Sequence, residues 1–235
     1  MKILYLYSDL MNLYGDYGNM KVLKSHLEKL NVECEIEKKG IQDELDLNRY
    51  DMIYIGSGTE SAQKLVLPHL KKYRNDLKIF IEEEKPVLLT GNAMELLGKK
   101  ISEDEALGII DMSVQETKDR YTGDAVMKSA QFGEVVGFIN KCTLIQMDEA
   151  DALFTYEFKD SNLKDNSYEG YRYKNLFGTH LIGPVLVKNP NFMKEIICTL
   201  LRNEEGFEYT DTASEFEKDS YQVTLEALKK RAQSK

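Results

Sequence analysis

The stretch Pro86-Val-Leu-Leu-Thr-Gly91 is a short, continuous apolar run that ends in glycine, and Asn92-Ala-Met-Glu-Leu-Leu-Gly98 follows it directly. Such a run is typical of a strand that is buried on both faces and delivers a loop at its carboxyl end. We therefore predict a strand-turn-helix elbow with its tip at Gly91. An elbow of this kind presents whatever group stands at its tip to the edge of the sheet.

Strand, loop and helix patterns also alternate before this elbow. Lys2–Ser8 predicts a strand that enters a loop rich in Asn, Asp and Gly, and Asn19–Leu30 has apolar residues at helical spacing. Val32–Lys38 alternates as a strand, Asp51–Gly58 is a second buried strand, and Ser61–Glu84 is amphipathic. This order predicts an α/β fold with a doubly wound, flavodoxin-like parallel sheet, because parallel neighbours need crossovers. Ligands of such sheets lie outside the carboxyl ends of the strands.

The second half of the chain carries short β-rich stretches with few helical signals, which predict a mixed or antiparallel region. These stretches are Arg120–Met127, Gly137–Leu144, Ala152–Phe158, Tyr171–Leu176 and Gly178–Val187. Pro190–Arg202 has one apolar side and predicts a closing helix. We therefore expect one domain over residues 1–202 and a polar, helical C-terminal extension over residues 203–235.

Composition excludes several classes of function. The chain has 235 residues, a formal charge of -9 and 42% hydrophobic residues, so it is too apolar for disorder and too acidic to favour nucleic acid. Its three cysteines are far apart and have no neighbouring His cluster, so we expect no disulfide frame, no metal site and no cofactor. No stretch approaches the roughly 18 apolar residues of a membrane span, which predicts a cytoplasmic protein. His26 and His69 lie on helical stretches, and we expect both to be solvated.

Several motifs resemble one family. The loop Asp9-Leu-Met-Asn-Leu-Tyr-Gly-Asp-Tyr-Gly-Asn19 resembles the opening loop of the cobyric-acid-synthase-like (CobB/CobQ) class I glutamine amidotransferases, above all that of the GatD subunits of lipid II isoglutaminyl synthases. The resemblance continues in order through about residue 202. It includes these segments: Ile55–Gly58, Leu96–Gly98, Arg120–Asp124, Gly137–Asn140, Gly178–Pro184 and Lys188–Pro190.

The resemblance implies glutamine hydrolysis by an elbow cysteine and a histidine from a late strand, because a thiol attacks only as the thiolate that a nearby base produces. The elbow of the family reads Cys-Gly-Gly-aromatic-Gln-x-Leu-Gly, which puts the nucleophile position at Gly91. The late strand reads Gly-Thr-Tyr-x-His-Gly-Pro, which puts the base position at Ile182. Neither catalytic residue is intact.

Displaced residues are an alternative source of this chemistry. His180 lies two positions before the lost base, and this spacing returns it to the same face of a strand. Cys142 stands where the family segment Gly-Phe-x-Asn-His-Ser-Gly has its serine. A Cys142–His180 pair is therefore one hypothesis, and an inert thiol with a hydrogen-bonded imidazole is the other.

A binding pocket is expected even without catalysis. Gly58 and the N–H of Asn92 are candidates for a backbone nest that cradles an oxyanion or carboxylate. The resemblance makes Arg120 a contact to the substrate glutamine, and a planar guanidinium suits a carboxylate. Asn140 is a further candidate substrate-binding residue. A surface arginine beside acidic neighbours is the alternative for Arg120.

Three functions remain open from the sequence. The first is a GatD-type subunit that lacks glutaminase chemistry, a pseudoenzyme that scaffolds a Mur-ligase-like (MurT-type) synthetase in the amidation of cell-wall precursors. The second is an active subunit that hydrolyses glutamine through displaced residues. The third is a sensor that binds glutamine or a related small molecule in the same pocket.

Overall fold

The computed structural model describes residues 1–164 and 167–233, and its first sheet is the doubly wound sheet that the sequence predicts. Five neighbouring strands are parallel, and one edge strand, β11, is antiparallel to β12. In sheet order the six strands are β11 (Tyr171–Tyr173), β12 (Leu176–Thr179), β4 (Val87–Thr90), β3 (Met52–Ile55), β1 (Lys2–Leu6) and β2 (Glu35–Lys39).

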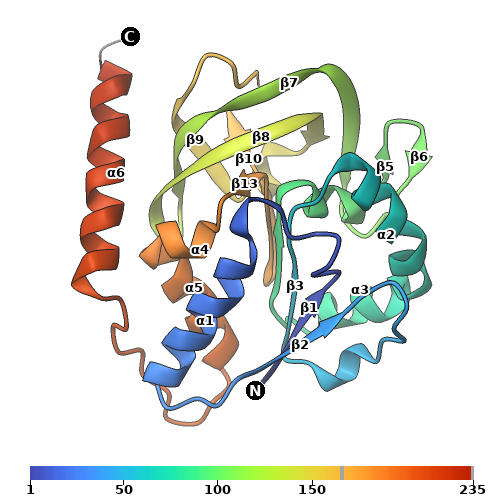
Figure 1. The fold of residues 1–235 in the computed structure, drawn as a ribbon, viewed down its shortest axis with the longest axis horizontal. Helices are drawn as coiled ribbons and strands as arrows, with labels where there is room; N and C mark the ends of the chain where they lie inside the picture. Colours follow the sequence, from blue (N-terminus) through green and yellow to red (C-terminus); the bar gives the residue numbers. More distant parts are fainter. Residues whose placement is uncertain (165–166, 234–235) are drawn as a thin grey trace.

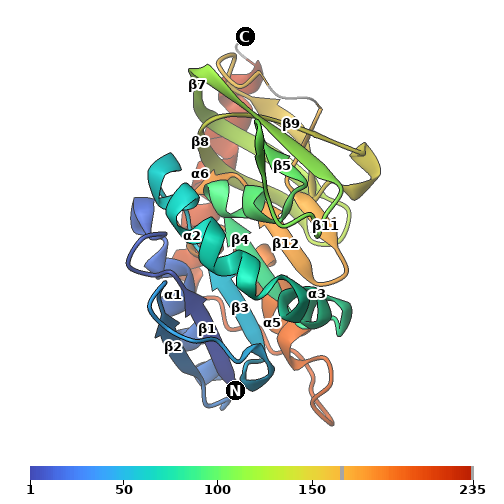
Figure 2. The same cartoon turned by 90° about the vertical axis from the view of Figure 1, so that its right-hand side faces the viewer.

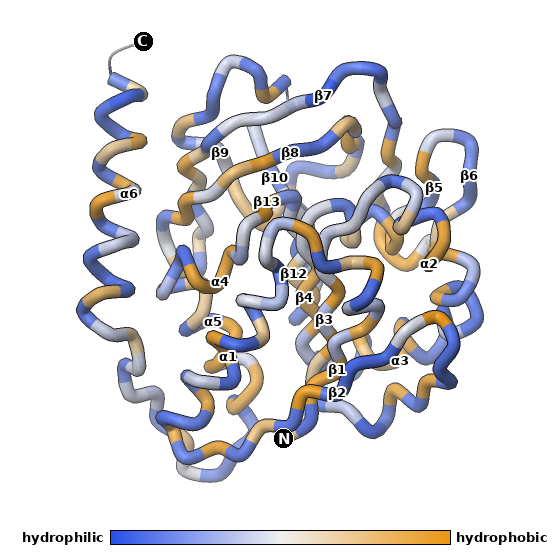
Figure 3. The backbone as a smooth tube through the Cα atoms, viewed as in Figure 1, coloured by the Kyte–Doolittle hydropathy of each residue, from blue (hydrophilic) through white to orange (hydrophobic). Residues whose placement is uncertain are grey.

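Helices cover both faces of this sheet (Figure 1). Alternate residues of β1 enter two different cores, because successive side chains of a strand point to opposite faces. Leu4 and Leu6 join the apolar cluster of the α2 and α3 side, and Ile3 and Tyr5 join that of the α1 and α5 side. The helices are α1 (Tyr17–Lys29), α2 (Glu60–Lys72), α3 (Arg74–Glu82), α4 (Val185–Lys188) and α5 (Pro190–Leu201). Figure 3 shows hydrophobic residues concentrated along β1, β3 and β4, between these helices.

A second sheet lies over the carboxyl ends of the parallel strands (Figure 2). Its centre is a long antiparallel hairpin, and β8 also pairs with β13, which opposes Ile182 to Phe138. This pairing holds the chain that follows β12 close to the carboxyl ends of the parallel strands. The strands of the second sheet are β5 (Lys100–Ile101), β6 (Asp104–Glu105), β7 (Met112–Ser129), β8 (Gly133–Met147), β9 (Phe154–Lys159), β10 (Tyr168–Glu169) and β13 (Leu181–Ile182).

Two details differ from the expectation. Gly178–Val187 and Tyr171–Leu176 were expected in the mixed second region, but β12 continues the parallel sheet beside β4 and β11 closes its edge. The end of the expected β-rich stretch Gly178–Val187 lies in the helix α4, Val185–Lys188. The helix expected after the elbow is present as a 3-10 helix, Gly91–Leu97. The crossover between β4 and β12 consists mainly of the second sheet. Because it has no helical pattern before β12, the sequence gives no sign that the next strand is parallel to β4.

The chain beyond Arg202 ends in α6 (Glu215–Gln233), which packs along one side of the second sheet (Figure 1). Leu225 and Leu228 are buried against Val126 and Val136. Arg231 forms ion pairs with two acidic residues of the domain, Asp124 and Asp160, at 3.0 and 2.8 Å. Within the described residues, no helix combines the length and the apolar character needed to cross a bilayer.

Candidate functional site

Gly91 forms the tip of the elbow after β4, and its backbone is in the left-handed region with φ of +58°. A residue with a side chain is strained in that region. A β-carbon built on Gly91 would lie 3.4 Å from Cγ2 of Ile182. The positions that the sequence assigned to a nucleophile and its base are therefore neighbours in space.

Ser57 fills the space beside the elbow. The β-carbon built on Gly91 would lie only 2.3 Å from Cβ of Ser57, which is far inside the contact distance of two carbon atoms. Ser57 is itself 2% exposed, so it has little room to move away. The structure thus leaves no volume for a side chain at the elbow tip.

A buried carboxylate holds Ser57 in this place. Oδ2 of Asp16 accepts hydrogen bonds from the N–H and the hydroxyl of Ser57 at 2.5 and 2.6 Å, and from the hydroxyl of Thr90 at 3.1 Å. Burial raises the pKa of Asp16, although the hydrogen bonds from Ser57 and Thr90 act in the opposite direction. Asp16 therefore ties the loop after β1 to the carboxyl ends of β3 and β4.

One cavity of about 280 Å³ brings together all eight residues that the sequence singled out. It lies at the carboxyl ends of the parallel strands, where such sheets hold their ligands. The eight residues are Gly58, Gly91, Asn92, Arg120, Asn140, Cys142, His180 and Ile182.

The backbone nest expected at Gly58 is engaged within the chain. The N–H of Gly58 donates to Oδ1 of Asn92 at 2.9 Å. The main-chain carbonyl of Asn92 in turn accepts a hydrogen bond from Nε2 of Gln63 at 2.7 Å. The Gly58 N–H, which was expected to bind an oxyanion, is thus paired with the side-chain amide of Asn92.

Arg120 lies at the rim of the cavity. Its Nη2 is 2.7 Å from Oε1 of Glu60, and its Nη1 donates to Oδ1 of Asn140 at 2.9 Å. Asn140 donates to the hydroxyl of Tyr14 at 3.0 Å. The guanidinium therefore faces the cavity with a carboxylate of the chain already bound to it.

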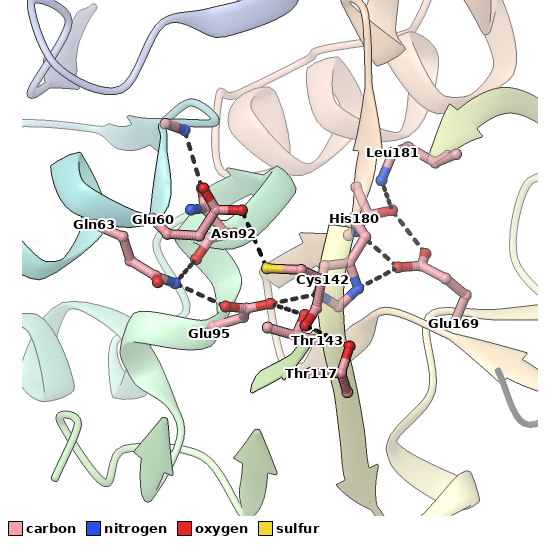
Figure 4. A network of polar contacts seen from close by, with 12 residues as sticks. Glu60, Gln63, Asn92, Glu95, Thr117, Cys142, Thr143, Glu169, His180 and Leu181 are labelled. Atoms are coloured by element: carbon pink, nitrogen blue, oxygen red, sulfur yellow. Dashed lines mark hydrogen bonds and ion pairs between the residues drawn. The ribbon is translucent and has the colours of Figure 1, made fainter. Parts of the chain in front are cut away.

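His180 is buried in a polar cluster at the wall of the cavity, and Figure 4 shows the contacts of this cluster. Its Nε2 is 3.0 Å from Oε1 of Glu95, and its Nδ1 is 3.2 Å from Oε1 of Glu169. The hydroxyl of Thr143 donates to the same Glu95 oxygen at 2.5 Å, and Gln63 donates to the other oxygen at 2.8 Å. His180 is thus held between two buried carboxyl groups.

The cluster favours the charged forms of His180 and Glu95. Burial and the charge of Lys141 lower the pKa of His180, but its contacts with Glu169 and Glu95 outweigh them and leave this pKa raised. Burial raises the pKa of Glu95, but contacts with His180 and Thr143 leave it below the usual range. A raised pKa favours the protonated imidazole, and a protonated imidazole is a poor general base.

Cys142 has Glu60 as its hydrogen-bond partner, not His180. Its thiol donates to Oε1 of Glu60 at 3.1 Å (Figure 4). Burial and this carboxylate raise the pKa of Cys142 to about 11. The pKa of a reactive cysteine is shifted in the opposite direction. The geometry therefore gives no support to a displaced Cys142–His180 catalytic pair.

Comparison with known proteins gives the family. The sequence profile of the CobB/CobQ-like glutamine amidotransferase domain matches residues 2–190. The chain belongs to this amidotransferase family. It is 31% identical to the GatD subunit of lipid II isoglutaminyl synthase (glutamine-hydrolyzing) from Staphylococcus aureus (strain N315), across 100% of this chain and 99% of that protein. The corresponding subunit from Streptococcus pneumoniae is 29% identical, across 88% of this chain and 82% of that protein.

Solved structures of glutamine amidotransferases share the fold. One from Thermotoga maritima has a TM-score of 0.55 at 14% identity and covers 100% of this chain and 92% of its own. One from Methylobacillus flagellatus has a TM-score of 0.51 at 12% identity and covers 99% and 90%. The α/β fold of this CobB/CobQ-like chain is therefore that of class I glutamine amidotransferases.

The sequence analysis did not single out Asp16, Glu60, Glu95 or Ser57, which form polar contacts in or beside the amidotransferase pocket. Asp16 and Glu60 bind groups of the cavity from distant segments, and nothing in their local pattern indicates this. Glu95 stands at the glutamine position of the family motif, and that substitution was a usable signal. Ser57 interrupts the two glycines of the loop after β3, which is a weaker one.

Two histidines lie elsewhere than expected. His26 is 3% exposed and hydrogen-bonds Thr212 at 2.6 Å and Glu217 at 2.8 Å. His69 is 7% exposed, and its Nδ1 lies 2.8 Å from the hydroxyl of Tyr7. The expectation of solvated imidazoles was wrong because both rings lie on the inner faces of their helices.

Proposed function

We propose that this chain is a GatD-like amidotransferase subunit that does not hydrolyse glutamine and that serves a synthetase partner as a non-catalytic subunit. The observation that carries the proposal is the contact between positions 91 and 182. Glycine and isoleucine stand side by side where the family motif has a thiol and an imidazole. Neither residue has a group that attacks an amide or transfers a proton.

The surroundings of the elbow support the same conclusion. Ser57 occupies the space of a nucleophile side chain, and Asn92 binds the N–H of Gly58. Covalent catalysis needs the nucleophile and its base, and electrostatic stabilisation needs free donors aimed at the developing oxyanion. Removal of one member of a catalytic unit costs about as much as removal of the whole unit. The changes therefore affect the nucleophile, its base and one donor of the backbone nest.

A synthetase partner is the second part of the proposal. The two curated relatives are named as subunits of a lipid II isoglutaminyl synthase. We expect this chain to dock on a Mur-ligase-like, ATP-using subunit and to take part in the amidation of a cell-wall precursor. We propose residues 1–202 as the docking domain and residues 203–235, which contain α6, as an extension with additional contact surface.

Co-expression of the full chain with the synthetase subunit of the same organism tests both parts. We expect a stable complex that amidates its acceptor with ammonium salts but not with glutamine. Amidation by glutamine at a comparable rate would show a hydrolysing subunit and overturn the first part. Failure to form any complex would overturn the second part.

A further inference from the structure

We propose that the pocket is occupied by its own side chains. Asn92 binds the Gly58 N–H and Glu60 binds the Arg120 guanidinium, the two groups that would otherwise bind the amide and the carboxylate of a free amino acid. This self-occupancy rests on the proposed function and extends the loss of glutamine hydrolysis to a loss of glutamine binding.

Asn92 supplies the amide. Its side-chain carboxamide is the functional group that a glutamine side chain carries, and its Oδ1 accepts the Gly58 N–H at 2.9 Å. The hydrogen bond from Gln63 to the Asn92 carbonyl, at 2.7 Å, holds the turn from which this side chain projects. A ligand amide that uses the same N–H must first displace Asn92.

Glu60 supplies the carboxylate. Its Oε1 accepts hydrogen bonds from Nη2 of Arg120 at 2.7 Å and from the Cys142 thiol at 3.1 Å. Burial raises the pKa of Glu60, but the bonds from Cys142 and Arg120 outweigh it, so the pKa lies below its usual range. Glu60 is therefore an anion at neutral pH, and it competes with any ligand carboxylate for Arg120.

The two side chains block the pocket unequally. Arg120 and Glu60 are 49% and 41% exposed, so water and salt weaken their attraction. The Asn92 amide is only partly exposed, and a displaced amide must find another partner. Asn92 is thus harder for a ligand to displace than Glu60. Glu60 competes with the ligand carboxylate for Arg120. Together they exclude a small amino acid with a terminal amide.

Calorimetric titration of L-glutamine into the full chain and its variants tests the self-occupancy. We expect no measurable binding to the wild type and measurable binding to Asn92→Ala/Glu60→Ala. The gain should be about tenfold to hundredfold in affinity, as expected when one neutral and one charge-assisted hydrogen bond become available. Lys64→Ala is the matched control, because Lys64 lies on the same helix and pairs with Glu116 outside the cavity lining.

Two further titrations show whether the gain in affinity depends on the ligand carboxylate and Arg120. Adding Arg120→Ala to the double variant should abolish the gain, and 4-aminobutanamide, which lacks the carboxylate, should bind the double variant no better than the wild type. Tight glutamine binding by the wild type would overturn self-occupancy. So would a double variant with wild-type thermal unfolding that fails to bind.

A measurement on the wild type decides the question even if the double variant does not fold. The Gly58 amide should be protected from hydrogen exchange, and a large excess of glutamine should leave that protection unchanged. A glutamine-dependent change would contradict self-occupancy. A wild type that binds glutamine without releasing glutamate refutes only the self-occupancy, whereas glutamate release refutes the proposed function itself.

Discussion

Ser57 and Gly91 share a space that holds only one side chain. A β-carbon on Gly91 would lie 2.3 Å from Cβ of Ser57, and Asp16 fixes Ser57 through hydrogen bonds from its N–H and its hydroxyl. A thiol cannot be reinstated at position 91 without a change at position 57. The loss of the nucleophile is therefore part of the packing of the elbow.

Gly91→Ala should lower the free energy of unfolding by about 3 kcal/mol, since left-handed strain costs roughly 1–2 kcal/mol and overpacking about 1–3 kcal/mol. Urea unfolding measures the loss. Gly133→Ala separates the two causes, because Gly133 also has a positive φ, +81°, but no atom within 4 Å of its β-carbon. We expect this control to cost only the strain.

Ser57→Gly should relieve the overpacking part of the Gly91→Ala loss. A double-mutant cycle over both positions should give a coupling of about 1–3 kcal/mol. Additive effects would mean that Ser57 does not occupy the space of the missing side chain.

The sequence predicted the framework of the site because that framework depends on local patterns. Apolar runs that end in glycine, such as the one ending at Gly91, gave β3, β4 and the elbow, and the resemblance placed Ile182 at the pocket. The parallel pairing of β12 with β4 was not predicted, because Leu176–Thr179 is short and follows a long antiparallel hairpin rather than a crossover helix. A strand of this length has no sequence pattern that distinguishes parallel from antiparallel pairing.

The polar contacts of the pocket could not be predicted in the same way. Ser57 meets Asp16, Glu95 meets His180, and Arg120 meets Glu60 across long stretches of chain. No periodicity links such residues, so only the folded chain shows which acid binds which donor. This is why Cys142 and His180 were plausible partners in the sequence but are bound to different carboxyl groups in the structure.

His180→Ala should destabilise the protein by about 3–5 kcal/mol, because the change leaves Glu95 and Glu169 buried without their shared partner. Chemical unfolding at pH 6 measures this effect. Arg202→Ala is the control, since its ion pair with Glu84 is partly exposed and should contribute less than about 1 kcal/mol. Equal losses for the two variants would argue against a charged cluster around His180.

The same cluster predicts a pH dependence. The pKa of His180 is raised in the folded state, so its stabilising contribution is fully present below the unfolded value of about 6.5 and is lost as pH rises through the folded value. The free energy of unfolding should therefore fall more steeply above pH 6.5 in the wild type than in His180→Ala. Parallel pH profiles of the two proteins would contradict this sign.

Cys142 should react slowly with iodoacetamide at pH 7, because its pKa of about 11 leaves little thiolate. Glu60→Gln removes the carboxylate that accepts the thiol hydrogen bond, so the rate should rise several-fold. Mass spectrometry of the Cys142 peptide measures the rate, and the Cys198 peptide of the same sample is the internal control. Fast alkylation in the wild type would support the hypothesis that Cys142 is a displaced nucleophile.

α6 should be held by the contact between Glu217 and the buried His26. Burial raises the pKa of Glu217, but bonds from Ser214 and His26 outweigh it and leave it at about 2, so this contribution is lost as pH falls from the ordinary glutamate value toward 2. His26→Ala should increase hydrogen exchange of the α6 amides at neutral pH. Lys218→Ala, which removes only exposed ion pairs, should leave them protected. Unchanged exchange in His26→Ala would refute the anchor.

Glutamate release from L-glutamine tests the central claim most directly. The purified chain, alone and with its synthetase partner, should release glutamate no faster than buffer, and intact-mass analysis should find no glutamyl thioester. Cys142→Ser and His180→Ala, run in parallel, should give the same background rate. Turnover by the wild type that either substitution abolishes would contradict the account and identify a displaced catalytic residue.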